Sequence, residues 1–263
     1  MKALFIFLLT HFIFVISLNA DEINFTQKEL TYIKNHPVIK VSNEDDWQPF
    51  DFSENGEAKG YSIDLIKHLA KKIGIKVEFV NGYTWTGLLE LFDNKKIDMM
   101  HVMARDEERL TKYSFSKTSY LKWQLSYYIR TDEKDIKSQN DFDGKKVSLG
   151  RNWVSTQKIK ELFPNLIIKT YDKSSDMLLA LSNHEVDIHV NNGLVISYIK
   201  SEYNINNIKR GGILHLGDYL EEDLYFVSHK DEPELSSIFS KAFNNMPSYK
   251  KVALQNRWFL YKE

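Results

Sequence analysis

The sequence contains no cysteine among its 263 residues. This absence excludes disulfide bonds, thiol nucleophiles, thiolate metal sites and a lipid-modified cysteine. Glycine is also sparse, and no P-loop, Gly-x-Gly-x-x-Gly or Gly-x-Ser-x-Gly pattern occurs. The usual sequence signatures of nucleotide-binding proteins and serine hydrolases are therefore missing.

A large net charge of either sign is missing as well. The formal net charge is −1 at pH 7, so nothing favours nucleic acid or an anionic membrane surface as a partner. The histidines form neither an H-E-x-x-H motif nor an i, i+4 pair on a predicted helix. We therefore expect no metal, no cofactor and no catalytic activity, although a pair of catalytic carboxylates is not disproved.

Long apolar runs occur only near the start of the chain. Residues 1–20 begin with the basic Lys2, continue with two apolar runs separated by Thr10-His11, and end at Ala20. This pattern is typical of a cleaved secretory signal peptide, because the unbroken run is shorter than the roughly 20 residues of a membrane span. An uncleaved anchor is the alternative. We expect the mature protein to be soluble, monomeric and periplasmic.

Helix and strand patterns alternate along the rest of the chain. A helix is predicted over residues 25–34 with Thr26 as its cap, and a strand over 38–42 follows His36-Pro37. Further strands are predicted at 76–80, 124–130, 167–171 and 224–228, with helices between them. Such alternation is an α/β signature.

One candidate anion site lies in the middle of the chain. Residues 98–103 form a short apolar run, which predicts a buried strand, and a charged turn that contains Arg109 follows. Arginine can hold a carboxylate with two parallel hydrogen bonds, which lysine cannot do. A solvated arginine on a surface turn is the alternative, and it is the better interpretation of these residues taken alone.

This stretch resembles the central motif of bacterial periplasmic solute-binding proteins of the amino-acid-binding type. The motif runs Gly-x-hydrophobic-Asp, then Thr-x-x-Arg, then Phe-Ser/Thr-x-Pro-Tyr, and it falls here on Lys96-Ile97-Asp98, Arg109 and Phe115-Ser116. The resemblance implies that Arg109 binds the α-carboxylate of the ligand. Met103, at the end of the predicted strand, is a further candidate contact.

The sequence departs from that motif in two places. Asp106 stands at the Thr position, and Thr118-Ser119-Tyr120 replaces Pro-Tyr. Asp106 would place an acidic group beside the anion site. In addition, the Asp that holds the ligand's ammonium in the family falls on Asn192, and an amide cannot pair electrostatically with an ammonium. We expect either an anionic ligand without an α-ammonium, or an amino acid whose ammonium finds another acceptor such as Asp106.

Aromatic and hydroxyl side chains supply the remaining candidates. Trp47 and Phe50 follow the first strand, and Trp85 opens a helix, so all three are candidate walls of a ligand cleft. Packing within the protein core is an equally good interpretation. Ser155 and Thr156 open another helix, whose free N–H groups would attract an anion beside Arg109. A simple helix cap is the alternative.

The resemblance implies a periplasmic binding protein type II-like α/β fold, with two lobes joined by a two-strand hinge. Lobe 1 would comprise residues 21–128 and 226–263, and lobe 2 residues 129–225, with the crossings near Ile129 and Phe226. Ligand capture would proceed by hinge closure.

The implied function is capture of a small polar, carboxylate-bearing ligand and its presentation to an ABC transporter permease. The predicted helix before the first strand also resembles the periplasmic sensor modules of some histidine kinases, so a membrane sensor is the alternative partner. A cyclohexadienyl dehydratase-like enzyme is a second alternative. The lytic transglycosylases share the fold in their first domain, but we expect none of their catalytic domain here.

Overall fold

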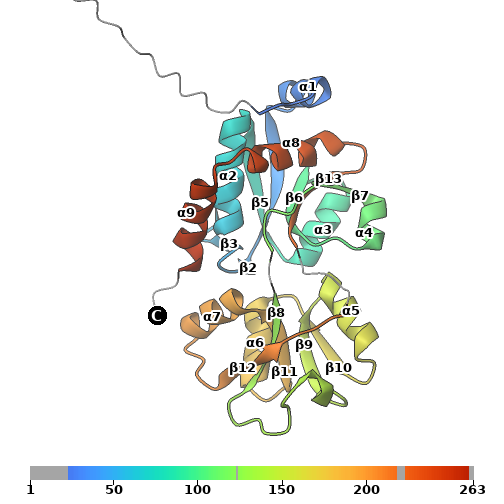
Figure 1. Cartoon of the computed structure of the whole chain (residues 1–263), viewed down its shortest axis with the longest axis vertical. Coiled ribbons are helices and arrows are strands. Elements are labelled where there is room, and N and C mark those ends of the chain that lie inside the picture. Colours follow the sequence, from blue (N-terminus) through green and yellow to red (C-terminus); the bar gives the residue numbers. More distant parts are fainter. Residues whose placement is uncertain (1–22, 123, 218–222, 261–263) are drawn as a thin grey trace, which may run out of the picture.

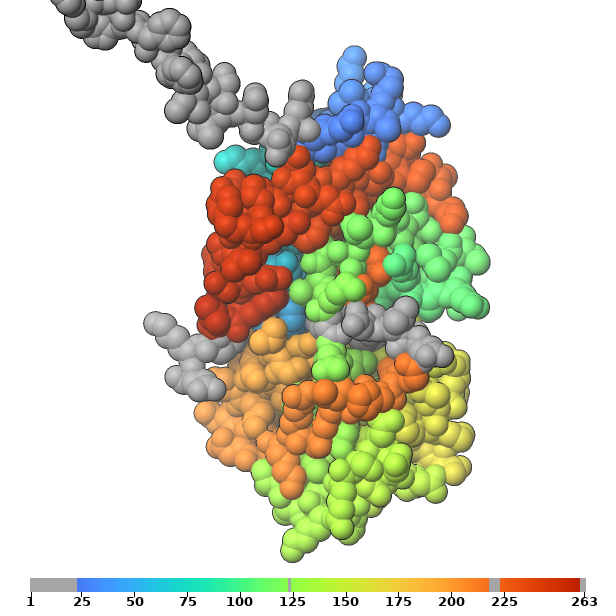
Figure 2. Space-filling model, viewed as in Figure 1, coloured from blue at the N-terminus to red at the C-terminus, as the bar shows by residue number. Residues whose placement is uncertain are grey.

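The computed structural model describes residues 23–122, 124–217 and 223–260. Two α/β lobes lie one above the other, each built around its own five-stranded sheet (Figure 1). The space-filling view shows the same two masses, in contact across a waist (Figure 2). The predicted two-lobed α/β fold is therefore confirmed. The predicted signal peptide, residues 1–20, lies outside the described residues.

The sheet of lobe 1 consists of β1 (Val38–Glu44), β5 (Lys76–Tyr83), β6 (Met99–Met103), β7 (Tyr113–Phe115) and β13 (Tyr225–His229). The strand order is β5-β1-β6-β13-β7. β1 pairs in parallel with β5 and β6, whereas β13 runs antiparallel to β6 and β7. All five residues of β6 are buried, as its continuous apolar sequence predicts for a central strand.

The helices of lobe 1 are α1 (Gln27–Asn35), α2 (Tyr61–Ile73), α3 (Trp85–Asp93), α4 (Glu107–Lys112), α8 (Pro233–Asn244) and α9 (Ser248–Phe259). In α2, Leu65, Ile66 and Leu69 are buried, because residues three and four apart share the face that packs on the core. α2 stops at Gly74, which adopts the left-handed conformation. α1 begins with the predicted Thr26 cap, whose Oγ1 accepts a hydrogen bond from the Glu29 amide.

A small antiparallel sheet projects from lobe 1 toward lobe 2. It consists of β2 (Asp46–Trp47), β3 (Asp51–Glu54) and β4 (Glu57–Lys59). In Figure 1, β2 and β3 lie at the edge of lobe 1 that faces lobe 2. Residues just after β1 are thereby brought to the interface between the lobes.

The sheet of lobe 2 consists of β8 (Leu125–Arg130), β9 (Lys146–Gly150), β10 (Ile167–Tyr171), β11 (Ile188–Asn192) and β12 (Ile208–Ile213). The strand order is β10-β9-β11-β8-β12. Its helices are α5 (Val154–Leu162), α6 (Ser174–Ser182) and α7 (Gly193–Glu202), with a short 3-10 helix at Gln139–Asp141. Tyr127, Phe142, Val147 and Val190 belong to a core cluster confined to this lobe.

The first crossing between the lobes differs from the sequence-based boundary. β8 pairs with β11 and β12, with Tyr128 opposite His189, so it belongs to the sheet of lobe 2. The crossing therefore lies before Leu125 and not near Ile129. An apolar, tyrosine-rich strand looks the same in either lobe, and only its hydrogen-bonding partners decide which sheet it joins. The second crossing precedes Tyr225, and Leu121 and Leu224 form an antiparallel bridge between the two crossings.

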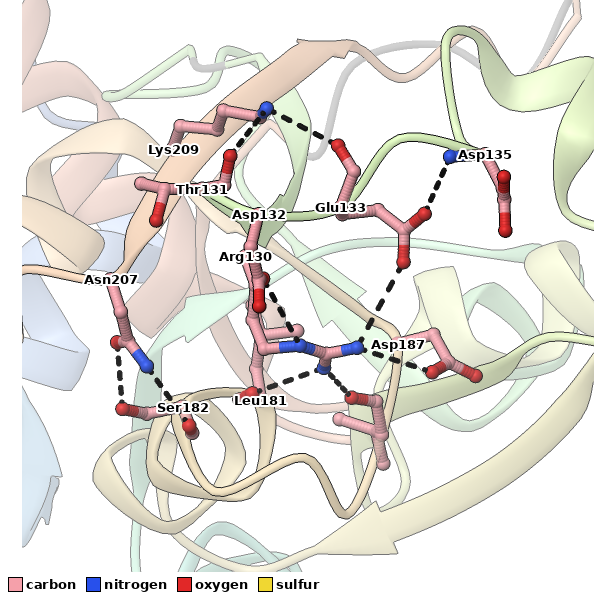
Figure 3. A network of polar contacts seen from close by, with 11 residues as sticks. Arg130, Thr131, Asp132, Glu133, Asp135, Leu181, Ser182, Asp187, Asn207 and Lys209 are labelled. Carbon is pink, nitrogen blue, oxygen red and sulfur yellow. Dashed lines mark hydrogen bonds and ion pairs between the residues drawn. The ribbon is translucent and has the colours of Figure 1, made fainter.

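A polar network fixes the far end of β8 inside lobe 2 (Figure 3). Arg130 is 8% exposed, and its Nη1 donates to the carbonyl oxygens of Val186 at 2.5 Å and Leu181 at 3.3 Å. Its Nη2 lies 3.5 Å from Asp187 Oδ1. Because a buried guanidinium needs such partners, β8 is tied to the segment that joins α6 to β11.

Candidate functional site

Arg109 lies at the interface between the lobes. Asp106 caps α4, and its Oδ1 accepts a hydrogen bond from the Arg109 backbone N–H at 2.7 Å. The Arg109 guanidinium donates from Nη1 to the Ala104 carbonyl and from Nη2 to the Asn152 carbonyl, both at 2.9 Å. Its central carbon is 5.5 Å from the centroid of the Trp85 ring. Arg109 therefore contacts both lobes, since Asn152 belongs to lobe 2.

Asn152 makes three contacts with lobe 1. Its carbonyl also accepts a hydrogen bond from Trp85 Nε1 at 3.2 Å, and its side-chain amide donates to Thr86 Oγ1 at 3.1 Å. Its backbone is left-handed, with φ of 59°, a conformation that asparagine tolerates better than most residues. Sequence reasoning missed this residue, although an asparagine between a strand and a helix was a usable signal.

A cavity that opens to solvent lies beside Arg109. Both lobes contribute to its lining. The lining residues are Glu44, Trp47, Trp85, Val102, Ala104, Arg109, Trp153, Val154 and Leu224. Arg109 is the cation of this set and Glu44 the carboxylate, and three tryptophans surround them. The lining therefore combines a cationic and an acidic group with aromatic walls, the mixture of a few polar groups and apolar surface that is typical of small-molecule sites.

Trp153 reaches the cavity because a glycine, Gly150, stands three residues before it. A Cβ added at Gly150 would lie 2.1 Å from the Trp153 ring, so only a residue without a side chain allows the ring to fold over this strand end. Trp153 precedes α5 and stands beside Asn152 in the chain. The sequence analysis did not select it.

Glu44 ends β1 and is the carboxylate that sequence reasoning missed. It is half-buried and lines the cavity. This burial raises the pKa of Glu44 well above its ordinary value, and the carboxylates of Asp51, Asp46 and Asp45 raise the pKa further. A cationic group bound beside Glu44 would reverse that effect.

A buried polar group supports the backbone of Glu44. Asp51 accepts hydrogen bonds from the Glu44 N–H at 3.1 Å and from Asn43 Nδ2 at 2.7 Å. His101 Nε2 lies 3.6 Å from Asp51 Oδ2, and both side chains are fully buried. Burial raises the pKa of Asp51 to about 7 and lowers the pKa of His101 to about 3. His101 is therefore neutral at physiological pH, while Asp51 titrates there.

The sequence matches one protein family over residues 39–261, which includes β1, the Arg109 turn and most of both lobes. The chain belongs to the bacterial extracellular solute-binding proteins, family 3. This family agrees with the resemblance seen in the sequence and with the two-lobed architecture.

Several relatives of this family 3 protein are binding or sensor proteins. The arginine-binding extracellular protein ArtP of Bacillus subtilis is 26% identical over 81% of this chain and 83% of its own length. A probable histidine-binding protein of Campylobacter jejuni is 27% identical, but the match spans 57% of this chain and 58% of that protein. The virulence sensor protein BvgS of Bordetella pertussis is 22% identical over 92% of this chain and 19% of its own length.

The crystal structure of the BvgS periplasmic VFT2 domain shows the same fold. Its TM-score is 0.80 at 22% sequence identity, over 90% of this chain and all of that domain. Together with the family match, this makes the present chain a ligand-binding protein of a family whose members act outside the cytoplasm. No helix among the described residues is long and apolar enough to span a membrane.

The other predicted site residues of this family 3 protein lie in several places. Asp106 and Thr156 line an outer groove between α4 and α5 that also reaches Arg109. Thr156 Oγ1 donates to the Gly150 carbonyl at 2.7 Å. Ser155 and Met103 are buried, with 2% and 0% exposure. The structure thus brings Arg109, Trp47 and Trp85 together in one cavity, with Asp106 and Thr156 at its outer side.

Phe50 and Asn192 line a second, more open groove, on which Arg210 and Lys200 also lie. Asn192 caps α7, and its Oδ1 accepts a hydrogen bond from the Leu194 N–H at 2.9 Å. Neither residue is among those that line the Arg109 cavity. Their roles as ligand contacts remain predictions.

Proposed function

We propose that this protein captures a small solute with a carboxylate and a cationic group, an amino acid or a related compound, in the Arg109 cavity. One observation carries the proposal: a guanidinium and a carboxylate, those of Arg109 and Glu44, line the same tryptophan-walled cavity. These two groups are complementary to a zwitterion.

The carboxylate of the solute would bind Arg109 and replace the Asn152 carbonyl as the acceptor for Nη2. A carboxylate can accept two parallel hydrogen bonds from a guanidinium, which a single carbonyl cannot do. The ammonium of the solute, or a cationic side chain, would bind Glu44. Asp106 is less suited to that task because its carboxylate already caps α4. Glu44 is therefore the acceptor that we propose for the ammonium, in place of Asp106. It supplies the negative charge that the amide of Asn192 lacks.

Capture would proceed by closure of the lobes about the two crossing segments, near the Leu121–Leu224 bridge. The mature protein would work in the periplasm as a monomer and present the solute to an ABC transporter permease. The likeness to ArtP, an arginine-binding protein, supports this role. The likeness to BvgS over 92% of the chain supports the alternative, in which the protein is the ligand-sensing subunit of a membrane signalling system.

A thermal-shift screen tests the binding function. Purified protein from residue 21 onward would be melted with L-arginine, L-histidine, L-cystine or L-glutamine, and with the deaminated analogue of each. A ligand that binds only the folded state raises Tm. We expect at least one intact amino acid to do so and its deaminated analogue to act more weakly. Equal shifts with both members of every pair would remove Glu44 from the proposed site.

Two further assays separate the remaining functions. Loss of radiolabelled solute uptake in cells that lack the protein would support transport, whereas unchanged uptake with an altered transcriptional response to the solute would support sensing. Prephenate incubated with the purified protein tests the dehydratase-like alternative. We expect no conversion, and measurable turnover would establish an enzyme.

A further inference from the structure

A carboxylate of lobe 1 caps a helix of lobe 2. The residue at the N-cap of α6 is Lys173, and no side-chain hydrogen bond from it caps the helix. Asp46, in β2, takes this role. Its Oδ2 accepts hydrogen bonds from the Ser175 N–H at 3.1 Å and from Ser175 Oγ at 2.8 Å. Ser175 is the second residue of α6, whose N–H is one that an N-cap acceptor normally satisfies.

The surroundings of Asp46 show that Ser175 is its main polar partner. Burial raises the pKa of Asp46, and the two hydrogen bonds from Ser175 oppose that rise. Lys173 lowers the pKa through its charge and Asp176 raises it, both from the start of α6. A carboxylate at a helix N-terminus also interacts favourably with the helix dipole. The polar interactions that favour charged Asp46 therefore come from lobe 2.

We propose that Asp46 is a closure latch, which holds the lobes together by capping α6 and releases that helix end when the lobes separate. This inference rests on the proposed hinge closure. The neighbouring Asp45 differs, because its Oδ1 accepts a hydrogen bond from the Gly82 N–H within lobe 1. Two adjacent aspartates thus bond to different lobes.

The latch is separate from the ligand contacts. Trp47 lines the Arg109 cavity, but Asp46 is not among its lining residues. Asp46 would therefore change affinity through the fraction of molecules that are closed, because apparent affinity scales with the population of the binding-competent state. Its charge also acts on Glu44, so the distance between the lobes, and not affinity, is the direct measure of the latch. The latch would act in the absence of any solute as well as in its presence.

The experiment measures the distance between the lobes with no solute added. The absence of cysteine allows spin labels at two introduced cysteines, Glu90→Cys on α3 and Lys160→Cys on α5, both at exposed positions. In Figure 1, these helices lie on facing sides of the two lobes. Double electron–electron resonance then gives the distance distribution for mature protein from residue 21 onward.

We expect Asp46→Ala to increase the ratio of long to short distances on the order of tenfold, as the loss of a helix cap predicts. Asp46→Asn keeps an acceptor oxygen but loses the charge, so it should lie between Asp46→Ala and the wild type. Ser175→Ala removes the Oγ donor and should also lengthen the distances. Asp45→Ala is the matched control and should leave them unchanged.

A distance distribution that stays at the wild-type position in Asp46→Ala and Ser175→Ala would overturn the latch. If Asp46→Ala fails to fold, as judged by circular dichroism, then wild-type distances in Asp46→Asn and Ser175→Ala would overturn it equally. The solute screen decides the proposed function independently. If no amino acid raises the Tm of the wild-type protein while Asp46→Ala still lengthens the distances, the latch stands and the proposed solute is rejected.

Discussion

Arg109→Ala is the substitution that tests the candidate site most directly. It removes a guanidinium that donates to the Ala104 and Asn152 carbonyls and lies 5.5 Å from the Trp85 ring. The fold should survive, because Asp106 caps α4 through the backbone N–H of residue 109 and not through its side chain. The affected quantity is therefore ligand affinity.

The magnitude follows from the bonds that a carboxylate would lose. A hydrogen bond to a charged group contributes about 1.5–3 kcal/mol, which corresponds to roughly a ten- to hundredfold loss of affinity. Arg109→Lys keeps the charge but not the two-pronged geometry, so it should recover only part of the loss. The loss should be larger for amino acids than for the corresponding amines, which carry no carboxylate.

Isothermal titration calorimetry measures this effect with the amino acid that gives the largest rise in Tm. Arg105→Ala is the matched control, because the Arg105 guanidinium lies 4.0 Å from the centroid of the Tyr225 ring and is not among the residues that line the cavity. We expect Arg105→Ala to bind within about twofold of wild type, because it removes none of the proposed ligand contacts. Wild-type affinity in Arg109→Ala would place the anion site elsewhere and refute the reasoning.

Three further predictions concern charge and export. Because burial raises the pKa of Glu44, a cationic ligand should displace the Glu44 proton when it binds, and its affinity should rise with pH until Glu44 is ionised without ligand. Titrations in buffers of different ionisation heat measure the released proton, and Glu44→Gln should abolish it. Asp51 has a pKa of about 7 in the fold and 3.8 as its ordinary value, so the folded state holds this proton more tightly. The free energy of unfolding should then fall by up to roughly 4 kcal/mol between pH 4 and 7. Urea titrations at several pH values measure this, and the free energy of unfolding should depend less on pH in Asp51→Asn. The same pH dependence in Asp51→Asn and wild type would contradict this role of Asp51. Finally, the full chain should be exported and cut near Ala20, and mass spectrometry of intact periplasmic protein that still contains residues 1–20 would count against the signal peptide.

The sequence alone determined the fold class and the position of the anion-binding candidate. Alternating helix and strand patterns predicted an α/β protein, and the resemblance to the solute-binding family implied its two lobes. The apolar run of residues 98–103 became the central strand β6. Arg109 follows that strand in a short helix whose cap, Asp106, is three residues away. Such features depend on neighbours within one turn of helix or one strand, so a local reading can find them.

The tertiary structure decided which side chains share the cavity. Glu44 and Arg109 line it together although they lie on different elements. Asn152, 43 residues from Arg109, accepts that residue's hydrogen bond across the interface. Asn192 falls at the position that holds the ligand's ammonium in the family. In the fold it caps α7 and lines the groove that Phe50 also lines, and its role as a ligand contact stays a prediction.

The contact between Asp46 and Ser175 shows most clearly that a sequence pattern does not reveal which distant residues meet. These residues are 129 positions apart, and neither the DDW stretch nor the start of α6 carries a local sign of the other. The first crossing was likewise misplaced, because β8 could join either sheet until its partners β11 and β12 were known. Local sequence patterns fix which elements form, since those depend on nearby residues. Contacts between lobes depend on how two separately formed sheets meet, and no short-range pattern encodes that.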